Sequence, residues 1–327
     1  MLREQTAASR ERRTAALAGL RAYQQALRGP PPQPMTAIDR RGTARLYDYG
    51  GIGRAVIFVP SLINPALILD LSPATSLLRW LAREGAHPYL LDWGTPQPAD
   101  AALDITGHVE RILLPLIAGL AEPPVLVGYC LGGTMALAAA ASMHVAGCVA
   151  IATPWHFEGF GDAARADLAM LWEAARPGCE AMGLVPAEVL QAGFWRLDPA
   201  RIIAKYEAFG ALDPASDAAR TFVAMEDWAN SGAALTLAAG RQLFEEFIGG
   251  DRTGRGGWSV GGRVVDPQAL PCPTLEFVST TDRIVPRASA AGLADRRDLA
   301  LGHVGMIVGS RARAALWEPL AAWLRAQ

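Results

Sequence analysis

The sequence predicts an α/β fold with a mostly parallel central sheet, flanking helices and an inserted helical cap. Short apolar runs rich in β-branched residues occur at 55–60, 124–129 and 147–153, and helical segments separate them. This alternation implies right-handed crossovers between parallel strands. From 155 to 265 the strand signal fades and helical patterns replace it. Strand character returns at 274–279, so the cap interrupts one sheet.

The length and composition fit one large domain with an insertion. The chain has 327 residues, and 51% of them are hydrophobic, which is enough for a sizeable core. We predict an N-terminal amphipathic helix with a Pro-rich linker at 1–34, a core at 35–154 and 266–327, and a cap at 155–265. The expected cap helices lie at 170–175, 187–194, 199–209 and 218–247, the last interrupted near Gly232.

The composition argues against several function classes. A net charge of -2 gives no reason to expect a nucleic-acid partner. The four cysteines lack CxxC spacing, so we expect no disulfide framework, no metal site and no cofactor. No stretch approaches about 18 uninterrupted apolar residues, and no secretory apolar region opens the chain. We therefore expect no transmembrane segment and a cytoplasmic protein.

The chain begins with a basic amphipathic segment. Residues 2–28 combine leucines with six arginines, which predicts a helix ending at Gly29. This helix could dock on the core, on a partner subunit or on an apolar surface, and we favour simple docking. Strands are then expected at 45–49 and 55–60. The second is apolar on both faces, as is typical of a strand buried between helix layers.

The next elements follow from cap and breaker residues. Ser72 and Pro73 predict the start of a helix that Gly85 ends. A strand is expected at 88–91. Residues 105–120 then predict a helix that is broken or kinked at Pro115.

The strand at 124–129 leads into Gly128-Tyr129-Cys130-Leu131-Gly132, and an Ala-rich helical segment follows. Strand, sharp turn and helix in this order predict a nucleophile elbow. The residue at its apex has a strained backbone, so the positions two before and two after must be glycine. A lone cysteine is more often a small buried hydrophobe. The context favours Cys130 as a nucleophile.

Such a nucleophile needs a base and an acid that orients the base, in the chain order nucleophile, acid, histidine. His303 lies between a strand expected at 298–301 and a final helix expected at 311–324, which is the loop that carries the base. Asp282 follows the strand at 274–279. The alternative for Asp282 is that it only caps a turn.

Two backbone groups complete the predicted site. The N–H of Leu131 and one from the loop after residue 60, that of Leu62 by preference, would meet the oxyanion of an acyl-transfer intermediate. A second motif, from Gly257 to Gly261, matches the serine-hydrolase pattern around Ser259. It lacks a strand before it and a helix after it, so we predict a β-hairpin or surface loop there.

A set of motifs extends from about residue 40 to the C-terminus: Val59–Asn64, Ile68–Leu71, Tyr89–Gly94, Gly128–Thr134, Asp282 with Ile284–Pro286, Gly302-His303 with Gly305, and the cap segments Phe194–Trp195 and Met225–Trp228. Together they resemble the motifs of polyhydroxyalkanoate synthases. The compact length is similar to the short synthases that work with a second, non-catalytic subunit. The chain departs from the family by placing Arg283 after Asp282 and Phe244 where an aromatic hydroxyl is expected.

The resemblance implies an acyltransferase. Cys130 would accept an (R)-3-hydroxyacyl group from a CoA thioester, with His303 as base and Asp282 as its support or as activator of the incoming hydroxyl. A thiol suits this chemistry because the exchange of one thioester for another keeps the acyl group activated. The implied partners are acyl-CoA and a polyester chain, with either a second subunit or a homodimer. The surface of polyester granules is an alternative location within the cytoplasm.

Two alternatives stay open. A cysteine hydrolase of the same α/β-hydrolase fold, either a thioesterase or an ester or polyester hydrolase, would use water where the synthase uses an alcohol. A catalytically silent relative would act as a partner or granule-surface subunit. The sequence leaves the acyl chain length and the residues that bind the CoA phosphates undetermined.

Overall fold

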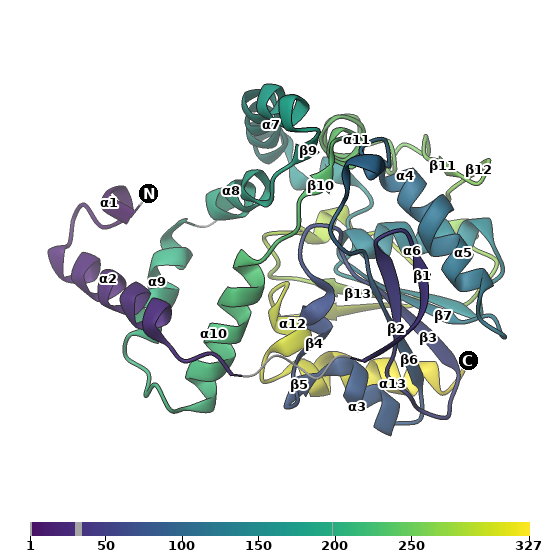
Figure 1. Ribbon diagram of the computed structural model, residues 1–327, viewed down its shortest axis with the longest axis horizontal. Coiled ribbons are helices and arrows are strands. Elements are labelled where there is room, and N and C mark those ends of the chain that lie inside the picture. Colours follow the sequence, from purple (N-terminus) through teal and green to yellow (C-terminus); the bar gives the residue numbers. More distant parts are fainter. Residues whose placement is uncertain (1, 30–34, 198) are drawn as a thin grey trace.

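A computed structural model describes residues 2–29, 35–197 and 199–327. Its centre is an eight-stranded sheet in the order β1-β2-β6-β3-β7-β8-β13-β14 (Figure 1). The strands are β1 (Thr36–Arg41), β2 (Ala44–Asp48), β3 (Ala55–Val59), β6 (His87–Asp92), β7 (Val125–Tyr129), β8 (Gly147–Ile151), β13 (Thr274–Ser279) and β14 (Arg296–Leu299). β2 pairs antiparallel with β1 and β6, and the other pairs are parallel. The predicted fold class is confirmed, with β1 as a strand that the sequence analysis missed.

The central strands are buried on both faces. In β3, Val56 and Phe58 belong to one hydrophobic cluster, and Ile57 and Val59 belong to the other. Each cluster is completed by helices on its own side of the sheet. The helices are α4 (Ile105–His108) and α6 (Leu131–Ser142) on the Ile57 side, and α3 (Leu77–Arg83), α12 (Gly305–Val308) and α13 (Glu318–Leu324) on the Phe58 side.

The helix expected at 105–120 is continuous but changes type. A π-helical turn (Val109–Leu113) joins α4 to α5 (Leu114–Ala118), and the N–H of Leu114 donates to the carbonyl of Val109. Pro115 stands at the start of α5. Because proline lacks an N–H and its ring crowds the preceding turn, the wider π turn lies directly before it.

The helix predicted to begin at Ser72 and Pro73 begins later, at Leu77. Its N-cap is Ser76, whose hydroxyl accepts the N–H of Arg79 over 3.0 Å. Ser72 ends a short strand, β4 (Asp70–Ser72), which pairs with β5 (Thr75–Ser76). The prediction was wrong because the pairing of β4 with β5 holds Ser72 in an extended strand, so the helix begins only after Ser76.

Helices dominate the chain between β8 and β13. They are α7 (Asp162–Met182), α8 (Ala187–Leu197), α9 (Pro199–Phe209), α10 (Asp217–Asn230), α11 (Leu237–Arg241) and a π-helical segment (Gln242–Gly249). β9 (Leu184–Val185) and β10 (Leu235–Thr236) pair between them. The predicted hairpin around Ser259 is confirmed by β11 (Ser259–Val260) and β12 (Arg263–Val264). The division of the chain into core and cap at 155 and 265 stays a prediction.

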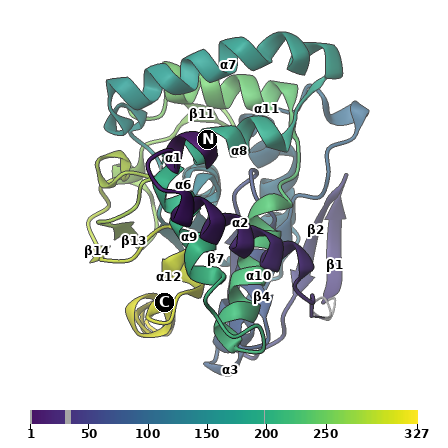
Figure 2. The same ribbon diagram turned by 90° about the vertical axis from the view of Figure 1, so that its left-hand side faces the viewer.

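The N-terminal segment forms two helices where one was expected, α1 (Leu2–Gln5) and α2 (Arg10–Gln25). α2 lies along α9, on the side of the molecule that faces the viewer in Figure 2, and Figure 1 shows it away from the central sheet. Arg12 pairs with Glu207 of α9, and the Tyr23 hydroxyl donates to Asp227 of α10 over 2.7 Å. The helix therefore docks on the helical insertion. Most of the predicted linker, residues 30–34, lies outside the described residues.

Candidate active site

The predicted elbow is formed where β7 meets α6. Cys130 has φ 57° and ψ -132°, and it is one of three non-glycine residues with positive φ among those that the structure describes. A side chain in this region is strained, so the surroundings must impose it. A Cβ on Gly128 would lie 2.3 Å from the Cα of Gly133, and one on Gly132 would lie 2.1 Å from the carbonyl oxygen of Val59. Glycine is therefore required on both sides of Cys130.

Asp282 and His303 come together at the carboxyl end of the sheet. His303 Nδ1 lies 2.6 Å from Asp282 Oδ2, and the Asp282 side chain is completely buried. The other carboxylate oxygen accepts the N–H groups of Ile284 and Val285 over 2.7 and 3.1 Å. Asp282 therefore caps a turn and holds the imidazole at once, so the two interpretations of this residue are compatible.

Cys130 acts electrostatically on the imidazole of His303. Burial acts to lower the pKa of His303, but the charges of Asp282 and Cys130 and hydrogen bonds to both side chains outweigh it and raise the pKa to about 10. The structure thus places the imidazole of His303 in a hydrogen bond with Asp282 and within electrostatic reach of Cys130. This arrangement favours the charged, imidazolium form of His303.

Tyr129 supports the histidine, and the sequence analysis did not single it out. Its ring stacks on the imidazole of His303 with centroids 5.0 Å apart and an interplanar angle of 29°. Its hydroxyl donates to the carbonyl of His303 over 3.2 Å. Burial raises the pKa of Tyr129 well above its ordinary value, so the hydroxyl stays a donor. The position of Tyr129 directly before Cys130 was the one sequence feature that could have pointed to this role.

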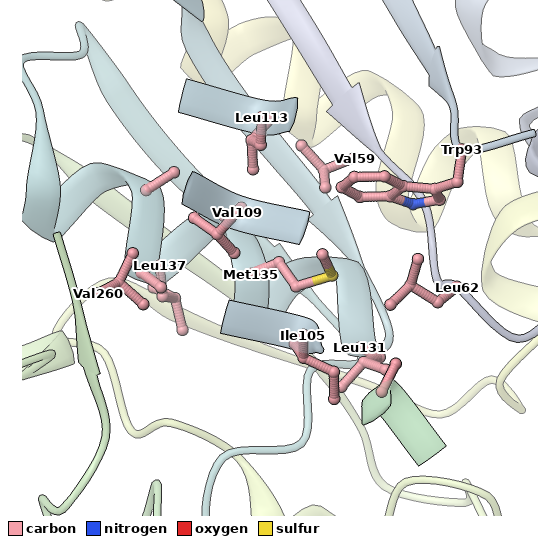
Figure 3. Packing of buried hydrophobic residues seen from close by; sticks show 14 of the residues in the cluster. Val59, Leu62, Trp93, Ile105, Val109, Leu113, Leu131, Met135, Leu137 and Val260 are labelled. Carbon is pink, nitrogen blue, oxygen red and sulfur yellow. The ribbon is translucent and has the colours of Figure 1, made fainter. Parts of the chain in front are cut away.

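The loop after β3 lies against the elbow. Ser61 Oγ accepts the N–H of Ile63 over 3.1 Å, so this N–H is already occupied. The N–H of Leu62 therefore stays the preferred oxyanion donor from this loop. Figure 3 shows the side chains of Leu62 and Leu131 on the same side of Met135. The N–H of Leu131 is the first of helix α6, a position that has no intrahelical acceptor. The oxyanion roles of Leu62 and Leu131 stay predictions.

Two tryptophans hold the ends of this loop. Trp93, just after β6, donates its indole N–H to the carbonyl of Pro60 over 3.0 Å. Trp228 of α10 donates to the carbonyl of Pro65 over 2.8 Å. Both belong to motifs that the sequence analysis quoted, but their contacts join residues far apart in the chain.

Cys130 opens into an apolar cavity of about 200 Å³ beneath the inserted helices. Its wall is mostly aliphatic and aromatic, from Ile63, Leu131, Phe157, Phe160, Leu168, Leu171, Val189, Leu190, Phe194, Leu243, Phe244 and Ile248. Phe244 stacks on Trp172 with centroids 5.0 Å apart, so an apolar ring occupies the position where an aromatic hydroxyl was expected. Two charged residues, Asp167 and Arg283, also line the cavity. Such a cavity suits the acyl part of a substrate.

Comparisons with known proteins agree with this fold. The family model described as "Alpha/beta hydrolase family" matches residues 56–316. The chain belongs to the alpha/beta hydrolase family. The fold of this hydrolase-family protein is similar to a Bacillus megaterium epoxide hydrolase (TM-score 0.57, 15% identity, 89% of this chain and 100% of that chain). It is also similar to a Paleococcus ferrophilus monoacylglycerol lipase (TM-score 0.54, 16% identity, 86% and 98%).

Among curated relatives, this hydrolase-family chain is similar to proteins named "Poly(3-hydroxyalkanoate) polymerase subunit PhaC". The Haloferax mediterranei protein is 27% identical over 82% of this chain and 58% of its own length. The Allochromatium vinosum protein is 28% identical over 82% of this chain and 80% of its own length. The chain thus spans less than two thirds of the Haloferax mediterranei relative. The predicted resemblance to polyhydroxyalkanoate synthases is confirmed.

Ser259, on the hairpin, is exposed, and it does not line the cavity at Cys130. The same is true of two other histidines, His144 and His156. All four cysteines are free thiols. Over the described ranges, no group of His, Cys, Asp and Glu side chains could hold a metal ion. Within the same ranges, no helix is both long and apolar enough to cross a membrane.

Proposed function

We propose that the protein is an acyltransferase of the polyhydroxyalkanoate synthase type. It would load (R)-3-hydroxyacyl groups from CoA thioesters onto Cys130 and transfer them to the hydroxyl end of a polyester chain. The observation that carries the proposal is the hydrogen bond of His303 to the buried Asp282, with Cys130 at the apex of the elbow acting electrostatically on the same imidazole. The similarity to proteins named PhaC supports the choice of substrate class.

In the loading step, the Cys130 thiolate attacks the thioester carbonyl. The oxyanion that forms would be met by the N–H groups of Leu131 and Leu62. When the tetrahedral intermediate collapses, the bond from carbon to the CoA sulfur breaks. The proton held by His303 passes to the departing CoA thiolate, which leaves as the thiol. The acyl group is then a thioester on Cys130, still activated for transfer.

In the transfer step, the neutral imidazole of His303 takes the proton of the attacking hydroxyl. The new ester bond forms as the bond between the acyl carbon and the Cys130 sulfur breaks, and the imidazolium and thiolate return. Water competes for the same acyl group. The apolar wall of the cavity at Cys130 disfavours water and so supports an alcohol as acceptor.

The proposal includes the surroundings of the reaction. The acyl chain would occupy the cavity at Cys130, and the enzyme would act at the surface of polyester granules in the cytoplasm. A second, non-catalytic subunit or a homodimer would complete the active form. These elements come from the resemblance to the synthase family.

Incubation with 3-hydroxybutyryl-CoA tests the proposal, with CoA release and turbidity followed together. Precipitating polyester with stoichiometric CoA is the expected result, and mass spectrometry of quenched protein should find the acyl group on the peptide that contains Cys130. Soluble hydroxy acid without polymer would identify the cysteine hydrolase. Cys130→Ala should abolish CoA release, whereas Cys272→Ala, at a half-buried thiol outside the site, should retain it.

A further inference from the structure

A second cavity, of about 320 Å³, lies beside the loop that carries His303. One side is contributed by Arg201 of helix α9, and the other by Arg311, which follows α12. Thr281, next to Asp282 in the chain, and Ser310 add hydroxyl groups to the lining. The cavity is therefore built from the inserted helices and the core together, close to the predicted catalytic groups.

The lining is basic. Arg201 and Arg311 are both exposed, and Arg311 also donates to the carbonyl of Ala300 over 3.3 Å. Among the lining residues in the described part of the chain, none is acidic. Arginine binds phosphate through two parallel N–H donors, and hydroxyl groups can supply further donors. The chemistry of the cavity thus fits an anion that carries phosphate groups.

Two glycines point independently to a ligand. A Cβ on Gly302 or on Gly305 would have no described atom within 4 Å, and neither residue has a φ in the left-handed region. Neither packing nor backbone conformation therefore requires glycine at these positions. Both line the cavity. A glycine has no side chain, so a ligand in the cavity can approach its backbone closely. We take this close approach as the reason for glycine at 302 and 305.

A third glycine of the same lining provides the contrast. A Cβ on Gly309 would lie 2.4 Å from the carbonyl oxygen of Gly305, so Gly309 is required by packing. Gly302 and Gly305, in contrast, have room for a side chain. They lie on either side of His303 in the sequence.

We propose that this cavity binds the phosphate groups of the CoA thioester whose acyl end reaches Cys130. This inference rests on the function proposed above and adds the subsite that holds the nucleotide part of the substrate. Arg201 and Arg311 bind the phosphates, and the backbone at Gly302 and Gly305 lies against them.

The decisive experiment compares two thioesters of 3-hydroxybutyrate, one of CoA and one of N-acetylcysteamine, which has no phosphate. For the double variant Arg201→Ala/Arg311→Ala, we expect the KM for the CoA thioester to rise by about tenfold or more, with kcat nearly unchanged. The kcat/KM for the N-acetylcysteamine thioester should not change. The matched control is Arg220→Ala/Arg263→Ala, two exposed arginines that do not line the cavity.

Gly302→Ala and Gly305→Ala test the backbone part of the proposal. Both variants should keep the melting temperature of the wild type, because the added methyl meets open space. Both should raise the KM for the CoA thioester and leave the phosphate-free thioester unaffected. Free CoA should inhibit turnover of the phosphate-free thioester by the wild type, and about tenfold more CoA should be needed with the arginine variant.

The outcomes separate the two proposals. If the wild type turns over neither thioester, the proposed acyltransferase function fails. If the wild type turns over both, and the arginine variant affects both equally or neither, the function stands and the cavity does not bind the CoA phosphates.

Discussion

The indole N–H of Trp228 donates to the carbonyl of Pro65 over 2.8 Å, and this bond ties helix α10 to the loop beside Cys130. The residue before it, Asp227, receives the Tyr23 hydroxyl and a bidentate ion pair from Arg28. The loop that contains Leu62 is thus connected through α10 to the N-terminal helix. Trp93 holds the other end of the loop from the core.

Removal of either indole donor should slow loading of Cys130. We expect Trp93→Phe and Trp228→Phe to lower the rate of CoA release by about tenfold, since a small displacement of the loop misplaces the N–H of Leu62. Each should lower the free energy of unfolding by about 1 kcal/mol. Stopped-flow CoA release and urea unfolding measure the two effects. Trp195→Phe, at an exposed indole of α8, is the control, and an equal rate loss in it would contradict the role of the loop.

The charge state of His303 should make stability depend on pH. Burial opposes the imidazolium, but Asp282 and Cys130 raise its pKa from 6.5 to about 10. The folded protein therefore binds this proton more tightly than the unfolded chain. The resulting stabilisation is fully present below pH 6.5 and is lost as the pH rises toward about 10. The free energy of unfolding of the wild type should exceed that of Asp282→Asn most at the acidic end of this range.

An NMR titration of the His303 imidazole gives the direct measurement. The wild type should titrate well above the ordinary range of histidine, and Asp282→Asn should titrate at lower pH because the neighbouring charge is gone. Identical midpoints in the two proteins would contradict the coupling between His303 and Asp282.

The elbow should not tolerate a methyl group at Gly128. A Cβ at this position would lie 2.3 Å from the Cα of Gly133 and 2.6 Å from the carbonyl oxygen of Gly132. Both are backbone atoms, which cannot move aside as a flexible side chain could. We expect Gly128→Ala to lower the free energy of unfolding by about 3 kcal/mol or more, measured by chemical denaturation. Gly178→Ala, in helix α7 with open space around the added methyl, should raise it by about 0.5–1 kcal/mol. A stable Gly128→Ala protein would show that the elbow can relax.

Loss of the Lys205 amine should destabilise the inserted helices. Its Nζ donates to both carboxylate oxygens of Glu226 over 2.7 Å, and the Glu226 side chain is only 9% exposed. In Lys205→Met this carboxylate loses both bonds from the amine and keeps the hydrogen bond from the Tyr206 hydroxyl. We expect a loss of about 2 kcal/mol in the free energy of unfolding. The double variant Lys205→Met/Glu226→Gln should recover most of it, and an equally unstable double variant would contradict the explanation.

The sequence alone predicted the fold, and it singled out Cys130, Asp282 and His303 as candidate catalytic residues. Cys130 could be placed because glycine spacing, strand and helix signals all lie within one short segment. Asp282 and His303 could be placed because chain order restricts them to loops after late strands. The start of helix α3 could not be predicted from the capping signal at Ser72 and Pro73, because the pairing of β4 with β5 moves the start to Leu77.

Contacts between distant segments also escaped the sequence analysis. The bonds from Trp93 and Trp228 to the loop after β3 depend on how β6 and α10 are placed in space. The same holds for Arg201, which lines the same cavity as Arg311 although the two residues lie far apart in the chain. Tertiary packing decides such contacts, and no local pattern encodes them.

Lys205, which pairs with Glu226, also offers a way to follow local unfolding of helix α9 by proteolysis. Lys205 is the only lysine in the sequence, so a protease that cuts solely after lysine has one target bond, the one before Tyr206. That bond lies within helix α9, and a helix must unwind locally before a protease can cleave it. The rate of this single cut in native buffer would therefore time the opening of α9, with no label attached to the protein.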